Sequence, residues 1–504
     1  MLRPRRRGLA SINSEVRDGI APAADGLALT STGPSSTAPA GRRHYRLIAL
    51  IIACAMFMEQ MDATVLTTAL PTMARDFGAP VTELSSALTA YLLALAIFIP
   101  ASGAMADRYG AKTVFRLAIL LFLAGSLLCG QAHSLPLLVP ARFLQGVGGA
   151  MMIPVGRLVL MRSVAKEDLV DAMSWLLVPA MIGPILGPPL GGFIVTYLNW
   201  RWIFYLNVPM ATLGVILVSR YFEQFRREDP PPFDTVGFVM SGVSLGCLLF
   251  GLEMLTRSDQ YRQAAGLLAV GIAAGALYVR HAVRRPHPIL DLSLLRVETF
   301  RLSVIAGSLS RIMQGAGPFL LPLMLQVGFG LSAVVSGSIT LAGAIGSFTM
   351  KGLAPRLLKR FGFRHILIVN GLAGSAGYAL CGFFRPGWPP ALIFGVLAAC
   401  GFCMSLQFTA YNTIAYDEIP SERMSAATSF YATFQQLMLS LGICVGAGAL
   451  HAAMLAARQA TPGLAQFTFA FLVVTSISAL ATVWHMRFSP TAGDELSGRR
   501  PSRA

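Results

Sequence analysis

The stretch "MFMEQMDATVLTTALP" (56–71) places two carboxylates, Glu59 and Asp62, inside an apolar run that begins near Leu47. An apolar run of this length is typical of a helix that crosses a bilayer. A charge at the bilayer centre costs roughly 2.5–3.5 kcal/mol on insertion scales, so such residues usually face a cavity and serve a function. Since residues three apart share one helical face, the stretch predicts a membrane helix that presents two acids to the protein interior.

The composition of the whole chain agrees with a membrane protein. Of the 504 residues, 55% are hydrophobic and 13% are charged, whereas soluble proteins contain about 25% charged residues. The apolar residues fall in blocks of about 20, long enough to cross a hydrocarbon layer of about 30 Å. A membrane β-barrel would show alternating segments of about ten residues instead. We therefore expect an all-α polytopic membrane protein.

The apolar blocks, separated by charged residues and by Pro or Gly, predict about fourteen membrane helices. The expected spans are 46–70, 82–103, 113–131, 136–160, 168–195, 200–220, 235–256, 263–281, 301–327, 332–352, 364–384, 389–413, 422–450 and 464–487. An even number of spans places both termini on the same side of the membrane.

The distribution of Lys and Arg predicts which side that is. Of the 40 basic residues, 31 flank the spans on the side of the termini and 6 flank them on the other side. This bias makes the side of the termini cytoplasmic. It also accounts for the net charge of +16 without a nucleic-acid partner. Residues 1–44 and 489–504 are expected to be cytoplasmic tails, the first of them disordered because it is polar and rich in Pro, Ser and Gly.

Two long charged connections divide the spans into six, two and six. We expect a six-helix bundle over 45–222, a linker with two additional helices over 223–299, and a second six-helix bundle over 300–488. The segments "GAMADRYGAK" (103–112) and "GLAPRLLKRFGFR" (352–364) each follow the second helix of their bundle, and they align at Gly110 and Gly362. Repeated halves with a site between them near the midplane are the usual plan of secondary transporters.

Five motifs together resemble a known family. "MDATVLTTALPTMA" (61–74) is similar to the first-helix signature of the major facilitator superfamily, in its fourteen-span drug:proton antiporter branch. "GAMADRYGAK" resembles the loop after the second helix, "RFLQGVGGAMMIP" (142–154) the fourth-helix motif, "GPILGPPLGG" (183–192) the antiporter motif, and "NWRWIFYLNVP" (199–209) the sixth-helix entry. The motifs cover the first six helices in the right order. Ala111 and Glu59 depart from the pattern, and the second half carries the loop motif only in degraded form.

The candidate proton-coupling and substrate residues lie in the first and fourth helices. Burial and a neighbouring acid both favour a carboxyl group that can take up and release a proton, and we expect Asp62 to carry the exchanged proton. Glu59 either shares this role or anchors a neighbouring helix. Arg142 and Gln145 share one face of the fourth helix. The resemblance implies that Arg142 influences the first-helix carboxylate, and a purely structural role is the alternative.

A second intramembrane arginine lies in "SRIMQGAGPFLLP" (310–322), which repeats the pattern of Arg, Gln and Gly in the ninth helix as Arg311 and Gln314. By the order of the repeat, the ninth helix corresponds to the first and not to the fourth. We therefore hypothesise that Arg311 faces the central cavity and binds substrate or balances Glu59 and Asp62. Chance similarity of the two motifs is the alternative.

Two further motifs predict moving or packing parts. In the loop after the second helix, Asp107 is expected to cap a helix of the other half or to pair with a base, and so to latch the inner mouth. Glycines in this loop permit close approach. In the fifth helix, a glycine stripe with prolines is expected to pack against a neighbour and to seal the outward route. The residues are Gly103, Asp107, Arg108, Gly110 and Lys112 for the gate, and Gly183, Pro184, Gly187, Pro188, Gly191 and Gly192 for the packing motif.

The predicted function is proton-coupled export of small lipophilic, multidrug-type compounds across the cytoplasmic membrane, which is expected to be a bacterial inner membrane. The alternatives are export of an endogenous organic acid or metal-chelating metabolite and, less favoured, a membrane sensor or scaffold. The expected partners are a small-molecule substrate, protons and the lipid bilayer, with no cofactor, no metal, no nucleic acid and no obligate protein partner. The sequence contains no ATP-binding motif and no clear nucleophile–base pair, so we do not expect an enzyme. Cys400 and Cys403 are expected to be packing residues, and Glu253 is expected at the membrane interface.

Overall fold

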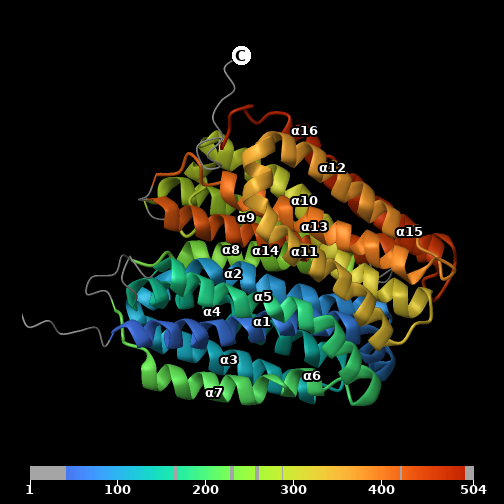
Figure 1. The fold of residues 1–504 in the computed structure, drawn as a ribbon, viewed down its shortest axis with the longest axis horizontal. Helices are drawn as coiled ribbons and strands as arrows, with labels where there is room; N and C mark the ends of the chain where they lie inside the picture. Colours follow the sequence, from blue (N-terminus) through green and yellow to red (C-terminus); the bar gives the residue numbers. More distant parts are fainter. Residues whose placement is uncertain are drawn as a thin grey trace, which may run out of the picture. The chain divides into compact units, whose positions relative to one another are not determined.

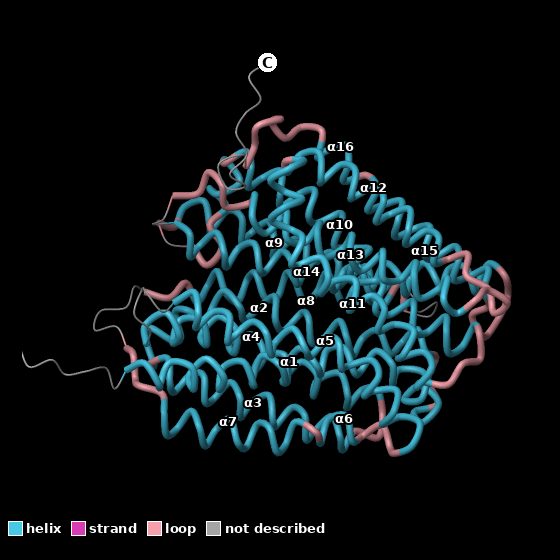
Figure 2. Tube along the Cα trace, viewed as in Figure 1, coloured by secondary structure: helices cyan, strands magenta, loops and turns pink. Residues whose placement is uncertain are grey.

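The computed structural model describes residues 41–163, 169–226, 232–255, 260–286, 288–420 and 423–493. Within these ranges the secondary structure is helical and contains no strand (Figure 2). The predicted N-terminal tail lies outside the described residues up to residue 40, and α1 already begins at Gly41. The predicted C-terminal tail lies outside them from residue 494 onward.

The first half of the chain contains six spans, which are drawn in blue to green in Figure 1. A broken helix, α6 with α7, forms the sixth of them. The bounds are α1 Gly41–Phe77, α2 Ser85–Tyr109, α3 Ala111–Gln131, α4 Leu135–Ser163, α5 Leu169–Tyr197, α6 Trp202–Tyr205 and α7 Asn207–Tyr221, with a short 3₁₀ turn, Val81–Leu84, before α2. This half matches the expected order of six spans.

Two more helices follow, and then six further spans. Helices α8 and α9 pack against each other, and α8 also contacts α2 and α14. The bounds are α8 Thr235–Met254, α9 Tyr261–Arg284, α10 Glu298–Leu323, α11 Ala333–Phe361, α12 Phe363–Cys381, α13 Pro390–Ile414, α14 Met424–Ala456, α15 Leu464–Ala479 and α16 Ala481–His485. Among the described residues, eleven helices are long and apolar enough to cross a membrane. The described helices follow the fourteen expected spans when α6–α7 and α15–α16 are each counted as one span.

The segments predicted as loops after the second and tenth spans are largely helical. Helix α2 continues to Tyr109 and α11 to Phe361, and one residue, Gly110 or Gly362, separates each from the next helix. Gly110 has φ +89° and Gly362 has φ +76°, a region that side chains disfavour. The expectation of a longer loop was wrong because the residues before each glycine sustain a helix until the glycine ends it.

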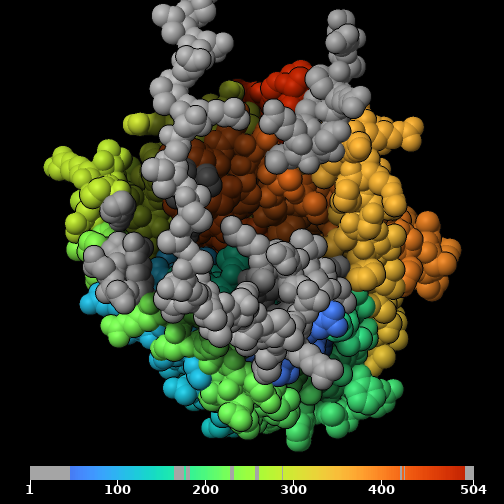
Figure 3. All heavy atoms as spheres, turned by 60° about the vertical axis from the view of Figure 1, so that its left-hand side comes forward, coloured from blue at the N-terminus to red at the C-terminus, as the bar shows by residue number. Residues whose placement is uncertain are grey.

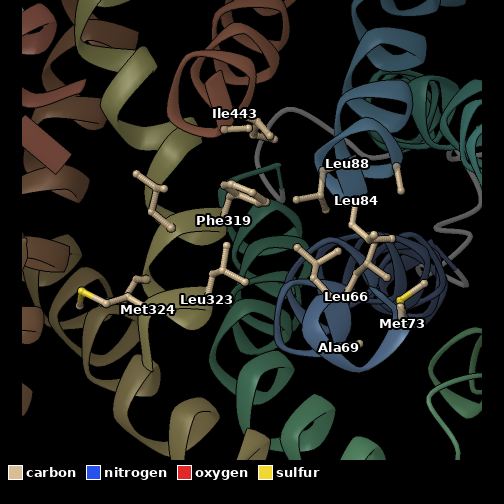
Figure 4. Packing of buried hydrophobic residues seen from close by; sticks show 14 of the residues in the cluster. Leu66, Ala69, Met73, Leu84, Leu88, Phe319, Leu323, Met324 and Ile443 are labelled. Carbon is tan, nitrogen blue, oxygen red and sulfur yellow. The ribbon is translucent and has the colours of Figure 1, made fainter. Parts of the chain in front are cut away.

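An apolar plug joins the two halves at the end of the molecule where α1 finishes (Figure 4). It draws residues from α1, α2 and its preceding turn, α10 and α14. Its labelled members are Leu66, Ala69, Met73, Leu84, Leu88, Phe319, Leu323, Met324 and Ile443. Polar contacts support it, since Gln326 donates to the carbonyl of Thr68 at 3.0 Å. At this end, which the charge bias predicts to be the outer side, the halves are closed against each other.

The opposite end is hollowed. Figure 3 shows this face, where α1 begins, with a depression between the blue-to-green first half and the orange second half. Gly103 of α2 is exposed, and a Cβ built there meets no atom within 4 Å. The structure is therefore closed at the predicted outer side and open toward the predicted cytoplasmic side.

Candidate functional site

The centre of the first half is an ion pair between Asp62 on α1 and Arg142 on α4. The Nη1 atom of Arg142 lies 2.6 Å from Oδ2 of Asp62, and neither side chain is exposed. The Nε atom of Arg142 donates to the carbonyl of Ala87 at 3.4 Å. Its guanidinium carbon lies 4.5 Å from the ring centroid of Tyr91, also on α2. The structure thus brings together two of the predicted residues and encloses the arginine between α1 and α2.

Amides complete this cluster. Gln145 accepts from Arg142 at 2.6 Å through Oε1, and its Nε2 donates to Oδ1 of Asp62 at 2.9 Å. Asn207, at the start of α7, donates to the same oxygen at 3.1 Å. Gln145 and Asn207 also both donate to the hydroxyl of Ser126 on α3. Helices α1, α4 and α7 therefore meet at one carboxylate, and α3 joins the cluster through Ser126.

Sequence reasoning missed Asn207 and Ser126. Asn207 lies inside the quoted sixth-helix segment, and it is an isolated amide in an apolar stretch. That isolation was a usable signal, because a buried amide needs hydrogen-bond partners. Ser126 gave no signal of its own, since a serine in a membrane helix usually bonds its own backbone.

Glu59 is buried beside this cluster on α1, with 4% of its surface exposed. Its Oε2 atom has no hydrogen-bond partner among the described residues. Arg142 pairs with Asp62, whereas no ion pair joins a described base to Glu59. The two acids predicted to act together have different surroundings.

Arg311 lies in the second half, away from an acid. It is 3% exposed, and Nη2 donates to Oε1 of Gln435 on α14 at 3.4 Å. Within the described chain no ion pair links Arg311 to Glu59 or Asp62. Gln314 is half-buried, and it forms no described hydrogen bond with Arg311. The resemblance to the Arg142–Gln145 motif therefore does not extend to the contacts.

The predicted gate residues lie at the inner end of α2. Asp107 pairs with Arg162 of α4 at 3.2 Å, and both side chains are partly exposed. Asp107 therefore pairs with a base, which was one of the two expectations, while no described hydrogen bond or ion pair joins it to the second half. Gly103 makes no close approach in this conformation, which corrects that prediction, because a Cβ built there meets no atom within 4 Å. Arg108 is exposed and Lys112 is half-buried.

Gly110, the remaining gate residue, allows a tight turn. The carbonyl of Phe225 accepts from the N–H of Ala111 at 2.9 Å. Gln224 donates to the carbonyl of Tyr109 at 3.2 Å, and a Cβ on Gly110 would clash with its side chain. The segment after α7 therefore packs directly on the turn between α2 and α3.

The glycine stripe of α5 packs against two helices. A Cβ on Gly183 would lie 3.0 Å from the carbonyl of Phe57, and Cβ atoms on Gly187 and Gly191 would clash with Thr64 and Thr68 of α1. Gly192 instead faces α11, where a Cβ would lie 2.5 Å from the carbonyl of Ala333. Pro188 contacts Gly337 of α11 through its carbonyl. Pro184 is half-buried.

Glu253 corrects a further prediction. It lies near the end of α8 and was expected at the membrane interface, yet it is 6% exposed and accepts from the hydroxyl of Ser85 at 3.2 Å. Its position near a helix end suggested exposure, but α8 packs against α2 and α14, and this packing buries the carboxylate.

Sequence comparison places these features in a family. The sequence model of the Major Facilitator Superfamily matches residues 52–443. The chain belongs to the Major Facilitator Superfamily. It is 36% identical over 467 residues to the "Putative multidrug resistance protein MdtD" of Klebsiella pneumoniae strain 342, a match that covers 90% of this chain and 97% of that protein. It is 35% identical over 456 residues to the "Probable transport protein HsrA" of Haemophilus influenzae, covering 90% of this chain and 98% of that one.

Two solved structures of transport proteins have the same fold. An auto-inhibited POT family peptide transporter superposes with a TM-score of 0.65 at 16% identity, over 89% of this chain and 97% of that one. A D-xylose-proton symporter superposes with a TM-score of 0.62 at 15% identity, over 89% and 98%. The protein is therefore a multi-pass membrane transporter of the Major Facilitator Superfamily, as the motifs predicted.

Proposed function

We propose that this transporter exports small lipophilic compounds across the bacterial inner membrane in exchange for protons. The observation that carries the proposal is the buried cluster of Glu59, Asp62 and Arg142. One base pairs with Asp62, and a second buried acid, Glu59, lies beside this pair without a base of its own. Two of the proteins that the chain resembles are named as a multidrug resistance protein and a transport protein, which supports export of drug-like molecules.

The net charge of the cluster can couple proton binding to the change of conformation. Arg142 remains protonated throughout, because guanidinium does not deprotonate in proteins. With both acids ionised the cluster carries a net charge of −1, and with one bound proton it is neutral. A buried site favours the neutral cluster, and substrate binding or contact with water changes that balance. Release of the proton on one side and uptake on the other then accompanies each change of conformation.

Alternating access follows from the two ends of the molecule. The hollow at the predicted cytoplasmic side receives substrate, while the apolar plug of Figure 4 prevents leakage. Export requires the plug to open, and the α5–α11 contacts at Gly192 and Gly337 to separate, as the inner end closes. Each charge moved down 100 mV supplies about 2.3 kcal/mol. One or two protons a cycle suffice, with no nucleotide.

Transport in inverted membrane vesicles tests the proposal. With an acid interior, wild type should accumulate a lipophilic dye, and an uncoupler should abolish the accumulation. Glu59→Gln and Asp62→Asn should reduce gradient-driven accumulation at least tenfold. Asp76→Asn is the matched control, since Asp76 lies on the same helix but near its exposed end, where it pairs with Arg201 at 3.0 Å.

The control should keep both transport and its dependence on the gradient. Expression and thermal stability of each variant in detergent separate loss of coupling from loss of folding. Accumulation by wild type that survives the uncoupler would contradict proton coupling. So would a Glu59→Gln, Asp62→Asn double variant that still pumps.

A further inference from the structure

The second half contains a buried cation that no acid neutralises. Arg311 on α10 donates to Gln435, and its guanidinium carbon lies 4.7 Å from the ring centroid of Tyr431 and 5.9 Å from that of Tyr411. Among the described residues, no carboxylate forms an ion pair with it. Its Nε atom also has no acceptor in the part of the chain that the structure describes.

This arrangement is costly for the empty protein. An uncompensated buried charge is strongly destabilising, and contact with aromatic faces offsets only part of that cost. Intramembrane cations usually mark the pathway of a substrate or ion. The missing element is an anion, which would take the free guanidinium N–H.

A second unsatisfied donor lies next to the first. The hydroxyl of Tyr431 is buried beside Arg311, and its O–H donates to no described residue. A Cβ built at Gly307 would lie against Nη1 of Arg311 and 3.5 Å from the Tyr431 hydroxyl, so both groups border the same glycine. Tyr411, in contrast, is engaged, because its hydroxyl contacts Ser310 and His485. The free donors therefore belong to Arg311 and Tyr431.

Helix α14 also places partly exposed side chains close in sequence to these donors. Phe434, Gln435 and Gln436 on α14 are half-buried, whereas Tyr431, one turn earlier, is buried. The rings of Phe430 and Phe434 stack with their centroids 4.6 Å apart, and the rings of Tyr416 and Tyr431 pack edge to face with their centroids 5.8 Å apart. A ligand here meets a cationic group surrounded by aromatic surface.

We propose that Arg311, Tyr431 and Gln435 bind the anionic oxygens of the exported compound, and that the preferred substrates are lipophilic molecules that carry one carboxylate. The inference rests on the proposed export function and narrows its substrate class. The guanidinium and the tyrosine hydroxyl donate to the carboxylate, the Gln435 side chain adds an amide donor, and the aromatic rings contact the apolar body. The alternative of an organic-acid exporter shares this recognition of a carboxylate.

Binding to the purified full chain, without any gradient, tests the inference. The probes are benzoate, 1-naphthoate and cholate, each paired with its neutral amide and measured by calorimetry in detergent. Wild type should bind at least one carboxylate at least tenfold more tightly than its amide. Arg311→Gln should reduce that preference at least tenfold, and Arg311→Lys should restore part of it, since it keeps the charge but not the planar fork.

Arg301→Gln is the matched control, because Arg301 is an exposed arginine on the same helix. It should change the preference less than twofold. The inference is overturned if wild type binds none of the three carboxylates more tightly than its amide. It is equally overturned if Arg311→Gln weakens binding of carboxylate and amide alike, which would make Arg311 a structural residue that does not recognise charge.

Gradient-driven uptake of the best probe separates this inference from the proposed function. A preference that depends on Arg311, together with uptake that ignores the proton gradient, would leave the anion site standing and refute proton coupling. Proton-driven uptake of the amide and carboxylate at equal rates and affinities would support proton coupling and refute the anion site.

Discussion

The two halves of this transporter each bury one arginine, and they treat it differently. Arg142 in the first half lies 2.6 Å from Asp62, with Gln145 and Asn207 completing the carboxylate's hydrogen bonds. Arg311 in the second half has a glutamine and two aromatic rings, and no carboxylate among the described residues. The first half neutralises its cation internally, whereas the second half leaves a positive charge to be matched.

This difference separates two tasks that one site would have to combine. A closed ion pair with a spare acid beside it suits proton exchange, because its net charge changes by one when Glu59 or Asp62 binds a proton. An open cation suits recognition of an external anion. We infer that the first half serves coupling and the second half serves substrate selection, and four measurements test this division.

The largest effect is expected from Asp62→Asn, which leaves Arg142 buried without a counter-ion. Removing one partner of a buried pair costs about 3–5 kcal/mol, and arginine cannot relieve the cost by losing its proton. Unfolding in mixed detergent micelles measures the change. A double variant that also carries Arg142→Gln should regain most of the stability and none of the coupled transport; equal losses in the single and double variants would show that the pair is not the cause.

In the second half, removal of the buried charge is expected to raise stability and not to lower it. Arg311→Met removes a buried charge that has no partner, so the free energy of unfolding should rise by about 1–3 kcal/mol. The same unfolding assay, without added carboxylates, measures it. A loss of stability as large as that of Asp62→Asn would mean that Arg311 is neutralised within the protein, and the contrast between the halves would disappear.

A smaller effect is expected at the two glycine turns. Gly110→Ala and Gly362→Ala place a side chain at positive φ, and each should lower stability by about 1–2 kcal/mol, with the larger loss at Gly110, where the new Cβ must also displace the side chain of Gln224. Gly103→Ala is the control, since its Cβ meets open space inside a helix, and it should not lower stability. Thermal unfolding in detergent compares the three; no loss at either turn would show that positive φ does not require glycine there.

The smallest effect is expected at Asp234, which precedes α8 and belongs to neither half. Burial raises the pKa of Asp234, but hydrogen bonds from His281 and from the N–H of Gly237 outweigh it, so this pKa lies below its ordinary value. The carboxylate therefore stabilises the fold above about pH 4, and the contribution is lost as the pH falls through the lowered pKa. Asp234→Asn should cost about 1 kcal/mol or less at pH 7.

The pH dependence of that difference is the decisive measurement. The gap in unfolding free energy between wild type and Asp234→Asn should shrink toward zero below about pH 4. A gap that stays constant from pH 7 to pH 3 would show that the charge of Asp234 contributes nothing to stability, because Asn can still accept the N-cap bond from Gly237.

Much of the fold was predictable because a membrane helix depends mainly on the residues of its own segment. An apolar block of sufficient length must form a helix that satisfies its own backbone in lipid, and the fourteen expected spans follow the described helices. The ends were less predictable: α2 and α11 extend beyond the apolar block, since a helix ends where its backbone is interrupted, at Gly110 and Gly362, and not where hydrophobicity falls.

The candidate site was predictable in part. Asp62 and Arg142 stood out because a charge inside an apolar run is costly wherever it lies. Asn207 and Ser126 did not, because their importance comes from pointing at Asp62 from other helices. The partner of Asp107 and the burial of Glu253 were likewise missed, since both depend on which helices pack side by side.

The sequence by itself determined the membrane location, the number and order of spans, the family and the presence of buried charges, because each of these follows from local composition or from short motifs. Only the tertiary structure decided which charges are paired. Arg142 meets an acid and Arg311 meets aromatic rings because the packing of α1 on α4, and of α10 on α13 and α14, fixes the few ångströms over which an ion pair forms or fails to form.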